Sequence, residues 1–113
     1  MKNSRIPLNN GGWFQENSAI CFNEDQQFDG RNMISRATGS QWDHQSLYYT
    51  RGGNFVLNEW SQYQGSLDTY DQIDETEAIE WLIAQNCADS ESFAALPKAV
   101  AERVAAGVVA AEV

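Results

Sequence analysis

His44 is the side chain in this chain best suited to acid–base chemistry, and it is the only histidine among the 113 residues. Asp43 precedes it directly, and Cys21 is a nucleophile that the fold could bring beside it. A hydrolytic site needs a nucleophile, a base and an orienting group brought together by the fold. Nothing in the spacing of these three residues indicates that arrangement. A small enzyme using His44 is therefore the third hypothesis, behind two non-catalytic ones.

Other chemical patterns are absent or ordinary. No GxxxxGK[ST] or GxGxxG phosphate-binding motif occurs, and there are too few histidines and cysteines for a transition-metal site. Asp71 with Asp74, or Glu77 with Glu80, could pair as carboxylates, but acids near a helix start are usually solvated. We expect no catalytic residue, no metal and no cofactor.

The acidic residues are distributed unevenly. The chain has 16 acids against seven bases, a formal net charge of −9. Between Arg51 and Lys98 there is no base. The acids of this interval are Glu59, Asp68, Asp71, Asp74, Glu75, Glu77, Glu80, Asp89 and Glu91. Such a field repels nucleic acid and acidic membrane surfaces and attracts basic partners, so direct nucleic-acid or membrane binding is not expected.

Two interpretations of this interval stay open. In the first interpretation, the interval is a solvated face. This suits Asp74, Glu75 and Glu77 because acids in the first turn of a helix complement the helix dipole. Alternatively, it docks on a basic surface, with tyrosines as anchors because tyrosine is enriched at interface hot spots. The second interpretation predicts these partner-binding residues: Glu59, Tyr63, Asp68, Tyr70, Asp71, Glu75 and Glu80.

Short strands and two helices must position these side chains. Apolar, aromatic segments bounded by turn residues predict strands over 18–24, 33–38, 46–50, 55–61 and 68–73. The turn at 51–54 contains two glycines and predicts a β-hairpin between the third and fourth of them. Asp74 as N-cap, with Glu77 three residues later, predicts a helix that stops at Asn86. The alanine- and valine-rich segment 98–112 follows Pro97 and predicts a second helix.

These elements predict an α+β fold, an antiparallel sheet of four to five strands with two helices packed on one face. We expect residues 1–12 to form a flexible N-terminal arm and residues 13–113 a single domain. Without a signal or membrane segment, we expect a cytoplasmic protein of a bacterial cell or phage host. Cys21 and Cys87 are expected to be buried free thiols in that compartment.

Several short motifs resemble those of a family of small bacterial proteins. They are GSQW-x-H at 39–44, LY-x-T at 47–50, WSQ-x-QGS at 60–66, TY at 69–70 and EA-x-x-WL at 77–82. The resemblance covers about residues 20–86 and brings no catalytic residues with it. It implies that His44 and the glutamine- and tryptophan-rich segments form one constellation. In size and charge the chain also resembles phage anti-defence proteins, including anti-CRISPRs and nucleic-acid mimics.

The leading hypothesis is a non-enzymatic inhibitor or regulator that occupies a basic site on a larger nucleic-acid-handling protein. The alternative is a structural or accessory homodimer joined through the stripe of Val100, Val104 and Val108.

Overall fold

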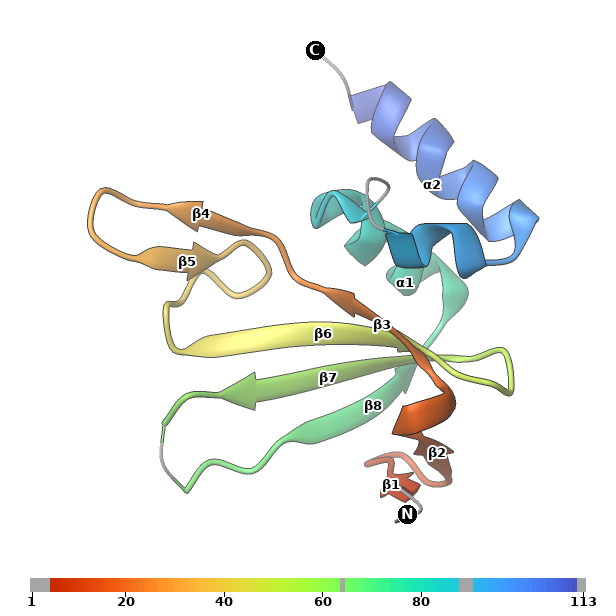
Figure 1. Ribbon diagram of the computed structural model, residues 1–113, viewed down its shortest axis with the longest axis horizontal. Coiled ribbons are helices and arrows are strands. Elements are labelled where there is room, and N and C mark those ends of the chain that lie inside the picture. The colour runs from red at the N-terminus through yellow and green to blue at the C-terminus, as the bar shows by residue number, and fades with distance from the viewer. Residues whose placement is uncertain (1–4, 64, 88–90, 112–113) are drawn as a thin grey trace.

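A four-stranded antiparallel sheet forms the centre of the computed structural model, which describes residues 5–63, 65–87 and 91–111 (Figure 1). Its strand order is β3 (Ile20–Asn23), β6 (Asp43–Tyr49), β7 (Phe55–Ser61) and β8 (Thr69–Ile73). Two small hairpins pair β1 (Arg5–Pro7) with β2 (Trp13–Gln15), and β4 (Gln26–Phe28) with β5 (Met33–Ser35). The helices are α1 (Glu75–Ala84) and α2 (Lys98–Ala111), with short 3-10 turns η1 (Glu16–Ser18) and η3 (Glu91–Ala95). The predicted α+β class, four-stranded antiparallel sheet and two helices are confirmed.

The β6–β7 hairpin is the longest paired unit of the sheet. Its register runs from Asp43 opposite Ser61 to Tyr49 opposite Phe55. Thr50 donates its main-chain N–H to the carbonyl of Asn54 at 2.8 Å, and Gly53 has φ +84°. A side chain at that φ would be strained, which explains a glycine in this turn. The predicted hairpin is confirmed.

The sheet register sorts side chains onto two faces, because residues directly opposite one another point to the same side. One face carries Ile20, Phe22, Leu47, Phe55 and Ile73. These side chains form the main hydrophobic cluster together with residues of the helices, namely Ala78, Ile79, Leu82, Val100 and Val104. We call this the helix-side face, and the other the open face.

The N-terminal hairpin covers one end of the open face. Phe14 of β2 packs on Tyr48 and Tyr70, with ring centroids 5.3 and 5.8 Å apart. Asn9 donates its main-chain N–H to the carbonyl of Tyr70 at 2.8 Å, which occupies part of the outer edge of β8. Part of the segment expected to be an arm, residues 5–12, thus contacts the sheet through apolar and amide side chains, and residues 1–4 lie outside the described residues.

The β4–β5 hairpin was not predicted. It projects from one end of the sheet (Figure 1). The segment between the strands expected over 18–24 and 33–38 contains β4, whose side chains are all exposed and therefore give no apolar alternation. The strand expected over 33–38 ends at Ser35, because Gly39 donates its N–H back to the Ser35 carbonyl at 2.8 Å and turns the chain.

The two helices begin and end largely as their local sequence indicates. The Asp74 carboxylate caps α1 by accepting the Glu77 main-chain N–H at 2.8 Å, and Asn86 takes a left-handed φ of 56° just beyond its end. Helix α2 packs against α1 and the core through Val100 and Val104. Among the described residues, no helix combines the length and apolarity needed to cross a membrane.

The cysteines differ in exposure. Cys87 is buried as expected, but Cys21 is exposed on the edge strand β3, and both are free thiols. Cys21 lies on the open face, whose cover does not extend over this strand, so the expectation of two buried thiols was wrong for Cys21.

Gly107 provides a stability test of the helix packing. A Cβ atom at this position would overlap the Cδ1 atom of Ile83 on α1, so the two helices meet closely there. We predict that Gly107→Val lowers the free energy of unfolding by about 1–3 kcal/mol, measured by urea denaturation, because overpacking forces the helices apart. The matched control is Ala106→Val, an exposed position one residue away. Equal losses in both variants would contradict a close helix contact at Gly107.

Candidate functional site

The two tryptophan-containing motif segments lie beside each other at one end of the sheet. His44 of β6 is directly opposite Trp60 of β7, and their rings stack with centroids 4.5 Å apart and an interplanar angle of 28°. Just beyond the strands, the Trp42 and Tyr63 rings lie 5.5 Å apart, and Gln62 donates its main-chain N–H to the Trp42 carbonyl at 2.9 Å. The expected constellation of His44 with these segments is therefore present as direct contacts; Gln64 lies outside the described residues.

A nearly buried carboxylate holds His44 in place. The Oε2 atom of Glu24 lies 2.6 Å from His44 Nδ1, and the exposed fractions of the two side chains are only 6% and 5%. The other oxygen, Oε1, accepts the Ser35 hydroxyl at 2.7 Å and the Gln45 main-chain N–H at 2.6 Å. Three donors thus surround one carboxylate, which satisfies it away from water.

This arrangement determines the tautomer of the neutral imidazole. An ionised carboxylate only accepts hydrogen bonds, so Nδ1 carries the proton and Nε2 has a free lone pair. The Nε2 atom is buried and has no hydrogen-bond partner among the described residues. A buried nitrogen without a partner is uncommon, because leaving it unpaired costs about 1–3 kcal/mol. In the neutral form of the ring, Nε2 is therefore a hydrogen-bond acceptor whose position is fixed by Glu24.

A cleft of about 480 Å³ adjoins this histidine. It is lined by Thr38, Asp43, His44, Glu59, Trp60, Ser61, Ser66, Leu67 and Thr69. The lining combines hydroxyls and acids with an indole and a leucine, and it contains no lysine or arginine. Its volume lies within the usual range of binding clefts, about 300–1,000 Å³. The cleft is suited to donor-rich or positively charged groups.

Acidic residues continue from this cleft across the helix-side face. By register, Asp43, Glu59 and Asp71 lie on this face of three neighbouring strands, each diagonal to the next. Diagonal neighbours are separated by roughly 7–8 Å. Trp81 of α1 donates its indole N–H to Gln45 Oε1 at 2.9 Å, which sets α1 beside Glu59, because Gln45 is opposite Glu59. Glu80 is exposed on the same helix, one residue before Trp81.

The predicted partner-binding residues do not all share this surface. Glu75 pairs with Arg103 of α2 at 2.7 Å, a neutralising base that lies beyond the base-free interval. Tyr70 lies on the open face, where it packs on Phe14 and donates its hydroxyl to Asp68 at 3.3 Å. Burial, followed by the negative charges of Asp68 and Glu16, raises the pKa of Tyr70 to about 12. Glu59 and Asp71 are diagonal neighbours on β7 and β8, and Tyr63 and Asp68 lie in the connection between these strands. Glu80 is exposed on α1, and Asp89 lies outside the described residues.

The catalytic set considered from the sequence is not assembled. Cys21 is opposite Tyr48, four residues along β6 from His44, which is about 13 Å at the usual rise of a strand. Asp43 and His44 are consecutive strand residues and point to opposite faces. Although Cys21 is exposed at the surface, partial desolvation by its neighbours raises the pKa of its thiol, which disfavours the nucleophilic thiolate. No group of three or more metal-ligating side chains occurs within the part of the chain that the structure describes.

Glu24 is the site residue that sequence reasoning missed. It lies 20 residues before His44, at the end of an expected strand, and only the pairing of β3 with β6 brings the two together. Comparisons with protein-family models, curated proteins and solved structures gave no match to this chain.

The tautomer of His44 can be measured directly, because the chain has one histidine. We predict that long-range ¹H–¹⁵N spectra of histidine-labelled protein show the neutral ring protonated at Nδ1. The carboxylate of Glu24 at 2.6 Å imposes this form. A neutral ring protonated at Nε2 would contradict the geometry.

Removal of the Glu24 charge tests how much the fold depends on it. An amide at this position has one acceptor oxygen for the three donors, so we predict that Glu24→Gln lowers the free energy of unfolding by about 1–3 kcal/mol. The control is Glu16→Gln, an exposed glutamate that accepts the Tyr48 hydroxyl at 3.2 Å. Denaturant titration of both variants should show the larger loss for Glu24; a loss no greater than that of the control would contradict a structural role for this carboxylate.

Proposed function

We propose that this protein is a non-enzymatic inhibitor or regulator that docks on the basic site of a larger nucleic-acid-handling protein. The observation that carries the proposal is a set of acids without counter-ions, several of them on neighbouring strands, beside an exposed aromatic pair at the strand ends. We call it the acidic docking surface: Trp42, Asp43, Glu59, Tyr63, Leu67, Asp68, Asp71 and Glu80.

The charges of this surface have no counter-ions within the protein. Among the described residues, the ion pairs involve Asp25, Glu24, Glu102 and Glu75, and none involves an acid of the acidic docking surface. Like charges held on neighbouring strands repel one another, at a cost to the fold. A partner rich in lysine and arginine would relieve that repulsion on binding. The repulsion would persist if these acids only faced water.

The aromatic pair supplies the apolar part of the interface. Trp42 is 43% exposed, Tyr63 is 58% exposed, and Leu67, which lines the neighbouring cleft, is 89% exposed. Trp and Tyr are enriched among interface hot spots, where they bury large areas at low entropic cost. Acids around such anchors give orientation and rapid association. The arrangement therefore favours protein docking over a purely electrostatic contact.

The partner class follows from the chemistry of phosphate recognition. Lysine and arginine side chains that bind phosphates also accept carboxylates, with arginine forming forked pairs to either group. Carboxylates spaced across three strands can therefore occupy a site that normally holds a nucleic-acid backbone. The homodimer alternative has less support, because Val100 and Val104 of its proposed stripe are buried inside the chain against the core, leaving Val108 as the exposed member.

Charge reversal on the acidic docking surface tests the proposal. Purified bacterial defence effectors would be titrated with the protein, and displacement of labelled DNA from each effector would be followed by fluorescence anisotropy at low and high salt. For an effector that the protein inhibits, we predict that Glu59→Lys with Asp71→Lys weakens inhibition at least about tenfold at low salt, or about 1.4 kcal/mol. The difference should shrink at high salt because exposed charges are then screened.

The matched control makes the same change of charge elsewhere. Glu91→Lys with Glu102→Lys alters two exposed acids on η3 and α2, outside the acidic docking surface. It should retain inhibition within about threefold. Inhibition that ignores salt, or that falls equally in both double variants, would contradict docking through this surface.

A further inference from the structure

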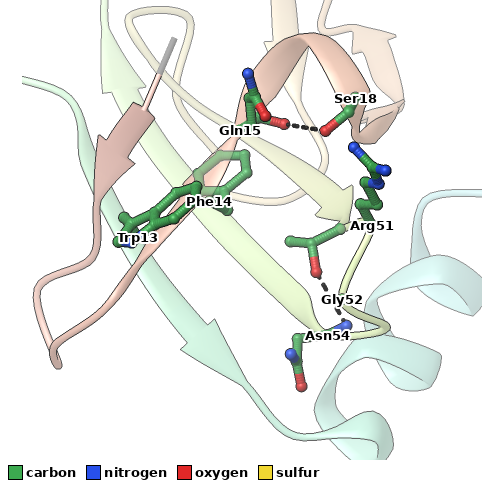
Figure 2. Close-up of a pocket in the computed structure, with 8 residues that line it drawn as sticks. Trp13, Phe14, Gln15, Ser18, Arg51, Gly52 and Asn54 are labelled. Atoms are coloured by element: carbon green, nitrogen blue, oxygen red, sulfur yellow. Dashed lines mark hydrogen bonds between the residues drawn. The ribbon is translucent and has the colours of Figure 1, made fainter. Parts of the chain in front are cut away.

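A second cleft lies at the opposite end of the sheet, beside the β6–β7 turn (Figure 2). Its volume is about 360 Å³. The lining residues come from β2, η1 and the turn: Trp13, Phe14, Gln15, Ser18, Thr50, Arg51, Gly52 and Asn54. The length of β6 separates this cleft from the acidic docking surface, so the two are distinct sites.

The charge at this cleft is opposite to that of the protein as a whole. Arg36, Lys98 and Arg103 each pair with a carboxylate. Arg51 has no ion pair with any residue that the structure describes, and neither does Arg5. Arg51 lines the cleft, and the guanidinium carbon of Arg5 lies over the ring of the lining residue Trp13, 4.5 Å from its centroid. In a chain of net charge −9, this is a local positive site without an internal counter-ion.

An aromatic wall faces this positive group. Figure 2 shows Trp13 and Arg51 on opposite sides of the cleft, with Phe14 between them. Phe14 is buried and backs the cleft, whereas Trp13 is 54% exposed. An exposed indole supplies a flat apolar surface for a ring, and a guanidinium supplies forked donors for a carboxylate or phosphate.

The polar groups of the cleft add hydrogen-bonding capacity around these two features. The Thr50 hydroxyl accepts the Asn54 main-chain N–H at 3.1 Å, which fixes the turn that carries Arg51. The Asn54 side chain and the Ser18 hydroxyl lie at the margin of the cleft (Figure 2). A few polar groups around an apolar wall are typical of small-molecule sites.

We propose that this cleft binds a small anionic ligand that carries an aromatic ring. The carboxylate or phosphate lies at the Arg51 guanidinium, and the ring lies against Trp13. Both parts are required, because an anion alone would use only the charge and a neutral ring only the indole. This is a function separate from docking on a basic partner, because the charge of the site has the opposite sign.

A panel of simple compounds tests the two parts separately. Benzoate and phenyl phosphate have both the ring and the anion, benzyl alcohol has the ring alone, and acetate and inorganic phosphate have the anion alone. Binding is followed by the indole N–H signals of ¹⁵N-labelled protein, with the Trp13 signal assigned from Trp13→Phe. We expect benzoate or phenyl phosphate to shift the Trp13 signal and to bind at least about tenfold more tightly than benzyl alcohol, acetate or phosphate. Preference between the two ring-bearing anions identifies a carboxylate or a phosphate ligand.

Arginine variants complete the test. Arg51→Gln should weaken binding of the preferred anion at least about tenfold, because a charge-assisted forked contact is lost. The control is Arg31→Gln, which removes an equally unpaired arginine at the turn between β4 and β5. The proposal is overturned if the Trp13 signal does not move up to the solubility limit of the ligands. It is also overturned if benzyl alcohol binds as well as benzoate, or if the two arginine variants bind alike. None of these results bears on the acidic docking surface.

Discussion

The buried carboxylate of Glu24 is the interaction on which one end of this small fold depends. It follows β3, the edge strand, and its two oxygens reach a main-chain N–H of β6, the His44 ring and the Ser35 hydroxyl at the end of β5. One side chain thus joins the central sheet to the β4–β5 hairpin. Without it, three donors in a nearly dry region would lack an acceptor, at a cost of several kcal/mol against a total stability that is typically about 5–15 kcal/mol.

This carboxylate also explains how the aromatic motif residues become ordered. His44 is held at Nδ1 by Glu24, and its ring then presents a flat surface on which Trp60 stacks. Trp42 and Tyr63 continue the aromatic contacts beyond the strand ends, where the main-chain bond from Gln62 to Trp42 keeps the two connections together. The buried contact between Glu24 and His44 therefore helps to position Trp42 and Tyr63, the exposed anchors of the proposed interface. Such pre-organisation lowers the entropic cost of binding.

The sequence predicts those parts of the fold that are determined locally. The glycine turn at 51–54 and the alternating strands on either side determine the central hairpin, and Asp74 and Asn86 bound α1 by their own capping chemistry. The missed elements depend on distant partners. The strand β4 is exposed along its length, and β1 is recognisable only through the packing of Ile6 against a sheet formed by residues much later in the chain.

The same distinction applies to the candidate site. The acidity of Glu59, Asp71 and Glu80 is evident from the sequence, but the sequence does not show that Glu59 and Asp71 are diagonal neighbours on two strands. Two features of the fold decide it: Arg103, which lies beyond the interval, pairs with Glu75, and the register places Tyr70 on the other face from Asp71. A stretch of sequence without bases can therefore still have a base beside it in the fold, because α2 packs against α1 and brings Arg103 to Glu75. Once Glu75 and Tyr70 are excluded, the proposed docking residues are a smaller group of acids and the Trp42–Tyr63 ring pair.

Charge is consequently separated along the sheet. Acids gather where β6 begins and β7 ends, while Arg51 and Arg5 lie at the opposite end, beside Trp13. Strand β6 spans this distance with the buried side chains of Leu47 and Tyr48, which belong to two separate hydrophobic clusters on its two faces. Because Arg51 lies about seven strand residues from Asp43, or roughly 20 Å, about two Debye lengths at moderate salt, these two charges do not neutralise each other. Each end of the sheet therefore keeps its own electrostatic character, which is the physical condition for one small domain to carry two sites of opposite preference.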